Sequence, residues 1–154
     1  MANTYKAVYL QVVFAVKHRN ALLAKEWRGR LFAYTTEVLR KRGHYPLAVN
    51  GYSDHVHLFF DYSTKELISD LVREVKKSMS NFIKDNDLTP FHFEWQTGYG
   101  VFSHGKREKG QIIEYIRNQE AHHSKRSFRD EYMSLLQLFE IEFKDEYVFD
   151  FLDV

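Results

Sequence analysis

The spacing of hydrophobic and polar residues changes several times along the chain, and each change marks the end of a predicted element. Short segments rich in β-branched and aromatic residues predict strands at Tyr5–Val16, Tyr45–Tyr52, His55–Tyr62 and Phe93–Ser103. Apolar residues three or four positions apart predict helices at Leu22–Arg42, Lys65–Asp85, Lys106–His123 and Phe128–Phe139. The Ser-x-x-Glu pattern of a capping box at Ser63–Glu66 predicts where the second helix begins.

The order of these elements predicts an α+β fold. A strand, a helix, the two strands of a hairpin, a helix and a fourth strand follow one another as in ferredoxin-like (RRM-like) folds, whose antiparallel sheet carries helices on one face. No Gly-, Ser- or Pro-rich linker divides the 154 residues, so we expect one domain. Within it we expect a core at 1–103, a helical segment at 104–126 and a C-terminal extension at 127–154. The second face of the sheet must be covered by another segment or must bind a ligand.

The composition excludes several classes of protein. With 44% hydrophobic and 16% aromatic residues, the chain can bury a core and is not of the disordered class. It has no cysteine, which excludes disulfide bonds, a thiolate nucleophile and cysteine-ligated metal centres. The first residues lack the apolar stretch of a signal peptide, and no apolar segment approaches the roughly 18 residues of a membrane span. We therefore expect a cytoplasmic protein that has no membrane partner.

The net charge of +1 conceals an uneven distribution of charge. Residues 1–129 carry 21 basic and 13 acidic side chains, a net charge of +8, whereas residues 130–154 carry one basic and eight acidic side chains, a net charge of −7. This asymmetry indicates an anionic partner for the basic part. A disordered acidic tail would not carry the aromatic residues found at the acidic end, which are Phe139, Phe143, Tyr147, Phe149 and Phe151.

The His55-Val56-His57 triplet is the first candidate for chemistry. Alternation along a strand places the two histidines on one face and Val56 and Leu58 on the other. If the apolar face packs under the helices, the histidines point to the uncovered face, about 6–7 Å apart along the strand. Two imidazoles at this spacing can bind one metal ion, but two histidines on a solvated strand face would give the same pattern.

The helix predicted at Lys106–His123 carries a second candidate group. Tyr115, Gln119 and His122 lie within about 60° of one another around such a helix, beside its apolar stripe. A phenol and an amide one turn apart are a candidate nucleophile and a candidate metal ligand. The chain has ten tyrosines, and most tyrosines pack with the hydroxyl at the surface, so periodicity alone assigns no role to Tyr115.

Taken together, these motifs resemble those of the single-tyrosine HUH transposases of the insertion sequence 200-like family. The resemblance rests on Asp54–Leu58, which contains the histidine triplet, on the Trp-x-x-Gly-Tyr pattern of Trp95–Gly100, and on Tyr115–Gln119 followed by His122 and His123. The motifs occur in this order over nearly the whole chain. Their combination is far more specific than the triplet alone.

The resemblance implies a DNA strand transferase. It implies that His55, His57 and Gln119 hold a divalent cation, Mg²⁺ or Mn²⁺. It also implies that Tyr115, on a helix appended to the core, attacks a phosphate of single-stranded DNA and forms a 5′-phosphotyrosine link. Finally, it implies a homodimer in which the tyrosine helix of one chain completes the metal site of the other.

Members of the family also bind a DNA hairpin on a basic surface. The candidate phosphate contacts here are Lys76, Lys77, Lys106, Arg107 and Lys109. The second helix departs from many relatives, because it reads Lys-Lys-Ser-Met-Ser where they have a Gly- or Ser-rich stretch. The resemblance assigns no role to the acidic end of the chain.

The same residues leave three alternatives open. A domesticated relative would use the same core to nick repeated palindromes. A metal-dependent hydrolase would combine His55 and His57 with a carboxylate, but Asp61 is too far along the strand from His57 to be an easy ligand. A non-catalytic module would stack nucleic-acid bases on Phe59 and Tyr9, although the basic and aromatic strand motif of ribonucleoprotein domains is absent.

Overall fold

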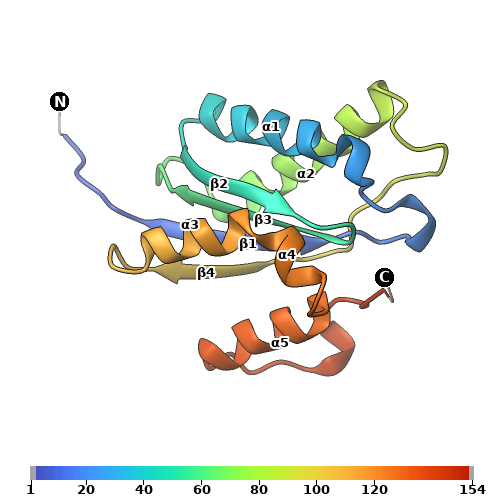
Figure 1. Cartoon of the computed structure of the whole chain (residues 1–154). Helices are drawn as coiled ribbons and strands as arrows, with labels where there is room; N and C mark the ends of the chain where they lie inside the picture. The colour runs from blue at the N-terminus through green and yellow to red at the C-terminus, as the bar shows by residue number, and fades with distance from the viewer. Residues whose placement is uncertain (1–2, 153–154) are drawn as a thin grey trace.

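The computed structural model describes residues 3–152, and its strands form one antiparallel sheet (Figure 1). The ferredoxin-like part comprises β1 (Tyr9–Ala15), α1 (Lys25–Lys41), β2 (Tyr45–Gly51), β3 (His55–Asp61), α2 (Ile68–Asp85) and β4 (Gly100–His104). After it come α3 (Lys109–Arg117), α4 (Gln119–His123) and α5 (Phe128–Leu138), and short 3-10 turns lie at η1 (Arg19–Ala21) and η2 (Asp145–Tyr147). The strand order β2-β3-β1-β4 confirms the predicted α+β fold. No helix within the described residues is long and apolar enough to cross a membrane.

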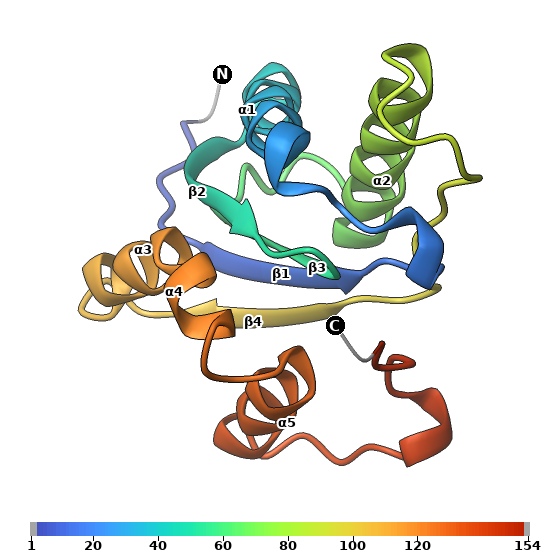
Figure 2. The same ribbon diagram turned by 45° about the vertical axis from the view of Figure 1, so that its right-hand side comes forward.

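Helices α1 and α2 cover one face of the sheet, and the main core lies beneath them (Figures 1 and 2). On β3, Val56, Leu58 and Phe60 are buried in this core together with Leu31 of α1 and Val75 of α2. Because side chains alternate along a strand, the same register turns the histidines of β3 to the opposite face. The strand pairing places Ala15 and Val13 of β1 opposite the two histidines.

The opposite face of the sheet is covered by the C-terminal extension, not left open. Figure 2 shows α5 on the side of the sheet away from α1 and α2. Phe128 and Tyr132 of α5 are buried together with Phe149 and with Phe102 of β4. A Cβ atom at Gly100 would lie 2.5 Å from the hydroxyl of Tyr132, so β4 can pass this close to α5 only with glycine. Tyr132 and Phe149 of the acidic end thus form a second apolar layer with Phe128, whereas Phe143 and Tyr147 are exposed.

The capping box predicted at Ser63–Glu66 is wrong. Helix α2 begins after this segment, with Leu67 as its N-cap residue and no side-chain hydrogen bond at the cap. The carboxylate of Glu66 instead lies 2.6 Å from Nη2 of Arg42 and 2.7 Å from Nε2 of His44. These two partners at the end of α1 outcompete the backbone N–H group that a capping box would use.

The helix predicted at Lys106–His123 is interrupted at Asn118. The side-chain amide of Asn50 in β2 donates hydrogen bonds to the carbonyls of Ile116, at 3.0 Å, and Arg117, at 3.1 Å. The last carbonyl groups of α3 are therefore satisfied by the sheet instead of by a further helical turn. Helix α4 then leaves in a different direction from α3 (Figure 1).

The fourth predicted strand, at Phe93–Ser103, pairs regularly only from Gly100 onward. Just before it, Gly98 adopts a φ angle of +88°, which other residues rarely adopt. The ammonium group of Lys76 on α2 donates to the carbonyls of Gln96, at 3.0 Å, and Gly98, at 2.7 Å. This segment is thus fastened to α2, and an isolated bridge between Trp95 and Val16 holds it beside the end of β1.

Candidate metal and tyrosine site

Strand β3 presents the two histidines of the triplet on the face that α5 covers. His55 and His57 are both fully buried, and their ring centroids are 5.2 Å apart. Phe128, the first residue of α5, stacks on the ring of His55 with a centroid distance of 4.0 Å. The predicted direction of the histidines is therefore confirmed. The expectation that they face an uncovered sheet is wrong, because α5 packs over them.

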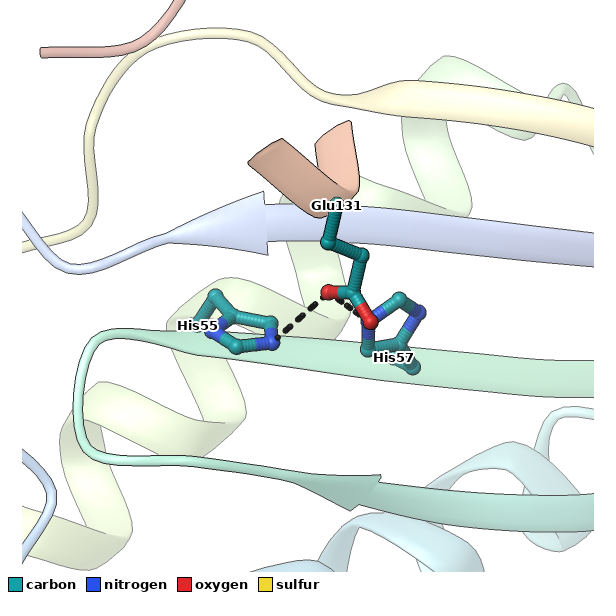
Figure 3. Close-up of side chains that lie close together, drawn as sticks. All are labelled: His55, His57 and Glu131. Carbon is teal, nitrogen blue, oxygen red and sulfur yellow. Dashed lines mark hydrogen bonds and ion pairs between the residues drawn. The ribbon is translucent and has the colours of Figure 1, made fainter. Parts of the chain in front are cut away.

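Glu131 of α5 lies between these histidines (Figure 3). Its Oε1 atom is 2.9 Å from Nε2 of His57 and 3.2 Å from Nε2 of both His55 and His123. The motifs in the sequence did not point to Glu131, and the acidic end had no predicted role. One signal was present: Glu131 lies on the buried stripe of its helix with Phe128 and Tyr132, and an acidic residue in an apolar stripe needs a partner.

Gln119 of α4 and Tyr115 of α3 contact the same carboxylate. The Oε1 atom of Gln119 is 2.9 Å from Nε2 of His55, and its Nε2 atom donates to Oε2 of Glu131 at 3.0 Å. The hydroxyl of Tyr115 also donates to Oε2 of Glu131. The residues singled out in the sequence on β3, α3 and α4 thus meet, and a carboxylate that the sequence motifs did not predict stands at their centre.

Each histidine of β3 has a second partner behind it. Nδ1 of His55 donates to Oδ1 of the buried Asp54 at 2.7 Å. Nδ1 of His57 lies 3.0 Å from the side-chain Nε2 of Gln11 on β1. The Oε1 atom of Gln11 in turn lies 2.8 Å from Nε2 of His104, the last residue of β4. Such outer partners orient imidazole rings and fix which nitrogen carries the proton.

The two histidines differ in their affinity for a proton. Burial alone lowers the pKa of His55, but the hydrogen bonds and charges of Asp54 and Glu131 outweigh burial and raise this pKa to about 9. For His57 burial dominates over the attraction of Glu131, and its pKa is lowered. At neutral pH the pair therefore consists of a protonated His55 and a neutral His57.

The pKa values of Tyr115 and Glu131 are shifted in opposite directions. Burial, and then the neighbouring charge of Glu131, raise the pKa of the Tyr115 hydroxyl far above its ordinary value. Burial would raise the pKa of Glu131, but its bonds to His57, His123 and His55 hold that pKa far below the ordinary value. The carboxylate is therefore ionised and the phenol keeps its proton.

The donor atoms of the site fit a divalent cation. One nitrogen from each of His55 and His57 and one oxygen of Glu131 all lie within 4.8 Å of one another. The amide oxygen of Gln119 adds a neutral donor beside His55. Carboxylate and amide oxygens suit Mg²⁺ and Mn²⁺, and the two imidazoles favour the transition metal of this pair.

The residues predicted to contact DNA do not form one surface. Lys76 and Lys77 lie on α2, and only Lys77 is exposed there. Burial lowers the pKa of Lys76 to about 8, and its ammonium is engaged by backbone carbonyls. Lys106 and Arg107 are exposed before α3, and the ammonium of Lys109 lies 5.4 Å from the ring centroid of Tyr9. Lys106, Arg107 and Lys109 therefore lie at or just before the start of α3, the helix that carries Tyr115.

Two clefts adjoin the site, and Arg126 lines both of them. A cleft of about 440 Å³ is bounded by Asp54, His123 and Arg129, among others. A second cleft, of about 230 Å³, contains Tyr115 together with Glu131, Gln11 and His104. These clefts are the openings from which a ligand can approach the buried residues.

Comparisons with known proteins agree with the motifs and the geometry. The family model described as "Transposase IS200 like" matches residues 4–119. The fold is similar to that of a protein of Deinococcus radiodurans R1 assigned as a transposase, with 22% identity, a TM-score of 0.60, and coverage of 77% of this chain and 96% of that one. It is also similar to a REP-associated tyrosine transposase bound to a REP hairpin, with 14% identity, a TM-score of 0.58, and coverage of 100% and 95%. None of the curated proteins compared matches. Because the family match spans more than half of its length, this chain belongs to the IS200-like transposase family.

Proposed function

We propose that this transposase cleaves and rejoins single-stranded DNA with Tyr115 as its nucleophile. The observation that carries the proposal is the convergence of the Tyr115 hydroxyl and the β3 histidines on one buried carboxylate. A metal-dependent hydrolase would need the histidines and a carboxylate, which Glu131 supplies. It would not need a phenol bonded to that carboxylate, and this contact favours the transferase.

The chain's own residues account for the covalent steps. Oη of Tyr115 attacks the phosphorus, the bond from phosphorus to the 3′ oxygen breaks, and the downstream fragment remains on the tyrosine through its 5′-phosphate. The phenolic proton passes to water, because the low pKa of Glu131 makes its carboxylate a weak base, and the leaving 3′ oxygen takes a proton from water. Attack by another 3′-hydroxyl on the phosphotyrosine rejoins the strand and returns the phenol, so no nucleotide cofactor is consumed.

The cation of the proposed reaction is Mg²⁺ or Mn²⁺. His55, His57 and Gln119 would hold it, and Glu131 supplies a further oxygen beside them. When bound, the cation polarises the scissile phosphate and offsets the negative charge that develops during attack. Asp54 and Gln11 keep the two imidazole rings oriented toward this position.

We infer that the substrate carries a DNA hairpin. The similarity to a transposase bound to a REP hairpin supports this inference. The proposed phosphate contacts are Lys76, Lys77, Lys106, Arg107 and Lys109.

Replacement of Lys106 and Arg107 by glutamine is expected to weaken hairpin binding. It should also reduce the slope of log affinity against log salt concentration by about 0.7–0.9 for each phosphate that is no longer neutralised. The matched control is Lys84→Gln, at the far end of α2.

A second candidate function is nicking of repeated palindromes by a domesticated relative. The extent of the structural alignments favours it. The REP-associated structure aligns with all of this chain, whereas the Deinococcus structure aligns with 77% of it. The chemistry would be the same. Cleavage of single-stranded REP-like hairpins without transfer to a second DNA end would distinguish this function from transposition.

We further propose a homodimer, in which the resemblance places the tyrosine helix of one chain at the metal site of the other. The described residues of one chain already place Tyr115 beside its own His57, with ring centroids 6.1 Å apart. The two arrangements therefore use the same contacts and differ only in which chain supplies α3 and α4.

Formation of a covalent adduct tests the proposed function. The protein is incubated with labelled single-stranded hairpin DNA and Mn²⁺ or Mg²⁺, and an adduct that survives denaturant is sought. Tyr115→Phe is expected to abolish the adduct and to leave hairpin binding unchanged, because only the hydroxyl is removed. Tyr147→Phe, an exposed tyrosine, is the control and should retain the adduct. An adduct that persists in Tyr115→Phe would exclude Tyr115 as the nucleophile.

A further inference from the structure

A buried amide on β1 connects the candidate metal site with the end of β4. The side chain of Gln11 is 1% exposed and bridges two histidines, with Nε2 at 3.0 Å from Nδ1 of His57 and Oε1 at 2.8 Å from Nε2 of His104. His57 in turn reaches Oε1 of Glu131 through its other nitrogen. The chain of contacts therefore runs from Glu131 through His57 and Gln11 to His104, which lines the smaller cleft beside Tyr115.

The two ends of an amide are chemically opposite, and this couples the two histidines. The nitrogen end can only donate and the oxygen end can only accept. A neutral imidazole carries one proton, so its two nitrogens also have opposite roles. In the arrangement seen here, Nδ1 of His57 accepts from Gln11, and the proton of His57 therefore lies on Nε2 and points to Glu131. At the other end, Nε2 of His104 donates to the oxygen of Gln11.

Binding of a cation through Nε2 of His57 requires the other tautomer. A ligating nitrogen must present its lone pair, so the proton must move to Nδ1 and find an acceptor there. A half-turn of the Gln11 amide supplies this acceptor, because it brings Oε1 to His57 and Nε2 to His104. His104 must then accept, which moves its own proton to Nδ1. His55 needs no change of tautomer, because the Asp54 carboxylate at its Nδ1 is already an acceptor, and it has only to release its Nε2 proton.

We propose that Gln11 is a positioning residue whose amide orientation sets the His57 nitrogen presented to the cation and ties cation binding to the tautomer of His104. The proposal rests on the proposed function, because it takes His57 as a cation ligand. The side-chain contacts of Gln11 are with His57 and His104. Gln11 acts through His57, and its state is reported by a histidine on a different strand.

The tautomers are read directly by long-range ¹H–¹⁵N NMR of the labelled full chain, first free of cations and then with Mg²⁺ added. His57 is expected to carry its proton on Nε2 in the cation-free protein and on Nδ1 in the loaded protein. His104 is expected to change in the same titration, from an Nε2 proton to an Nδ1 proton. A His57 that changes tautomer while His104 does not would overturn the coupling, as would a His57 that carries the Nδ1 proton throughout.

Variants of Gln11 separate positioning from packing. Gln11→Met keeps the size of the side chain and removes both hydrogen bonds, and it is expected to weaken Mn²⁺ binding by about 10–100-fold in calorimetry. Gln11→Glu keeps an acceptor for Nδ1 of His57 and is expected to bind Mn²⁺ within about threefold of wild type. The control is Gln137→Met, an exposed glutamine on α5, which should leave the affinity unchanged.

The outcomes distinguish this proposal from the proposed function. Gln11→Met that binds Mn²⁺ as tightly as wild type overturns the role of Gln11 and leaves the metal site intact. Equal losses in Gln11→Met and Gln11→Glu show that an acceptor for Nδ1 of His57 does not preserve binding, which also overturns the proposal. Wild-type protein that binds no Mn²⁺ overturns the metal site itself and, with it, the coupling.

Discussion

Glu131 accepts hydrogen bonds or ion pairs from three histidines, from the amide of Gln119 and from the hydroxyl of Tyr115. A buried carboxylate is costly unless it is paired, and here imidazoles provide the compensation. The protonation of His55 and the retention of the proton on Tyr115 are two consequences of the same negative charge. At the scale of single residues, the protonation states of the site therefore depend on Glu131.

Stability of the cation-free protein should depend on pH through His55. Its folded pKa of about 9 lies above the ordinary 6.5, so its contribution is fully present below pH 6.5 and is lost as the pH rises through about 9. In urea unfolding with a chelator, the free energy of unfolding is expected to fall by on the order of 3 kcal/mol over this interval. Asp54→Asn should show a smaller fall, because one of the groups that raise the pKa is gone. A constant free energy would contradict the assignment.

Removal of the Glu131 charge should lower the pKa of the Tyr115 hydroxyl. Burial is the first cause of the raised pKa and remains, whereas the neighbouring charge is the second and disappears in Glu131→Gln. The pKa of Tyr115 is expected to fall by about one unit or more. A pH titration of ¹³Cζ-labelled tyrosines measures it, with Tyr115→Phe used to assign the signal. An unchanged pKa would mean that burial alone keeps the phenol protonated.

Helix α5 is the element that brings this charge to the sheet. Ser127 caps it, with the Ser127 Oγ accepting from the backbone N–H of Asp130 at 3.1 Å, and its apolar stripe packs on the face that carries the histidines. Phe128 covers His55, and Tyr132 lies against the glycine at the start of β4. One helix thus closes the site and supplies part of its chemistry, although it lies outside the residues matched by the family model.

Two phenylalanines of the extension allow this packing to be measured. Phe128→Ala removes a ring that is 4% exposed and stacked on His55, and it is expected to lower the free energy of unfolding by about 3 kcal/mol or more. Phe143→Ala removes a ring that is 40% exposed, and its effect should stay within about 0.5 kcal/mol. Urea unfolding of both variants compares them. Similar small effects would show that α5 contributes little to the stability of the fold.

For the whole molecule, local patterns predicted the ferredoxin-like part well and the extension poorly. Alternation along β3 and the apolar stripe of α2 are properties of neighbouring residues, and both appear as predicted. The interruption at Asn118 depends on Asn50, a residue far away in the sequence, and no local pattern reports it. Glu131 was missed for the same reason, because its partners on β3 precede it by more than 70 residues.

The basic and acidic parts of the chain meet at the candidate site. The basic body and the acidic end are separate in sequence, but α5 inserts one acidic residue of that end among the histidines of the body. The division at residue 129 therefore does not separate the site from the extension. Within the described residues the acidic end contributes Tyr132 and Phe149 to an aromatic layer and places Glu131 among the histidines.

Whether a site is built from one chain or two is tested by mixing variants. Tyr115→Phe lacks the nucleophile and His57→Ala lacks a cation ligand, so each is expected to be inactive alone. The structure brings α3 and α4 to the β3 histidines of the same chain, and this arrangement predicts no adduct when the two variants are mixed. If α3 and α4 are exchanged between chains, up to about half of the sites in a mixed dimer recover both groups, and the adduct reappears.

Adduct formation on labelled hairpin DNA measures the result, with each variant mixed with wild type as the control for assembly. Restored activity would establish the shared site that the family resemblance implies, and it would mean that the contacts among Tyr115, Gln119 and Glu131 form between two chains.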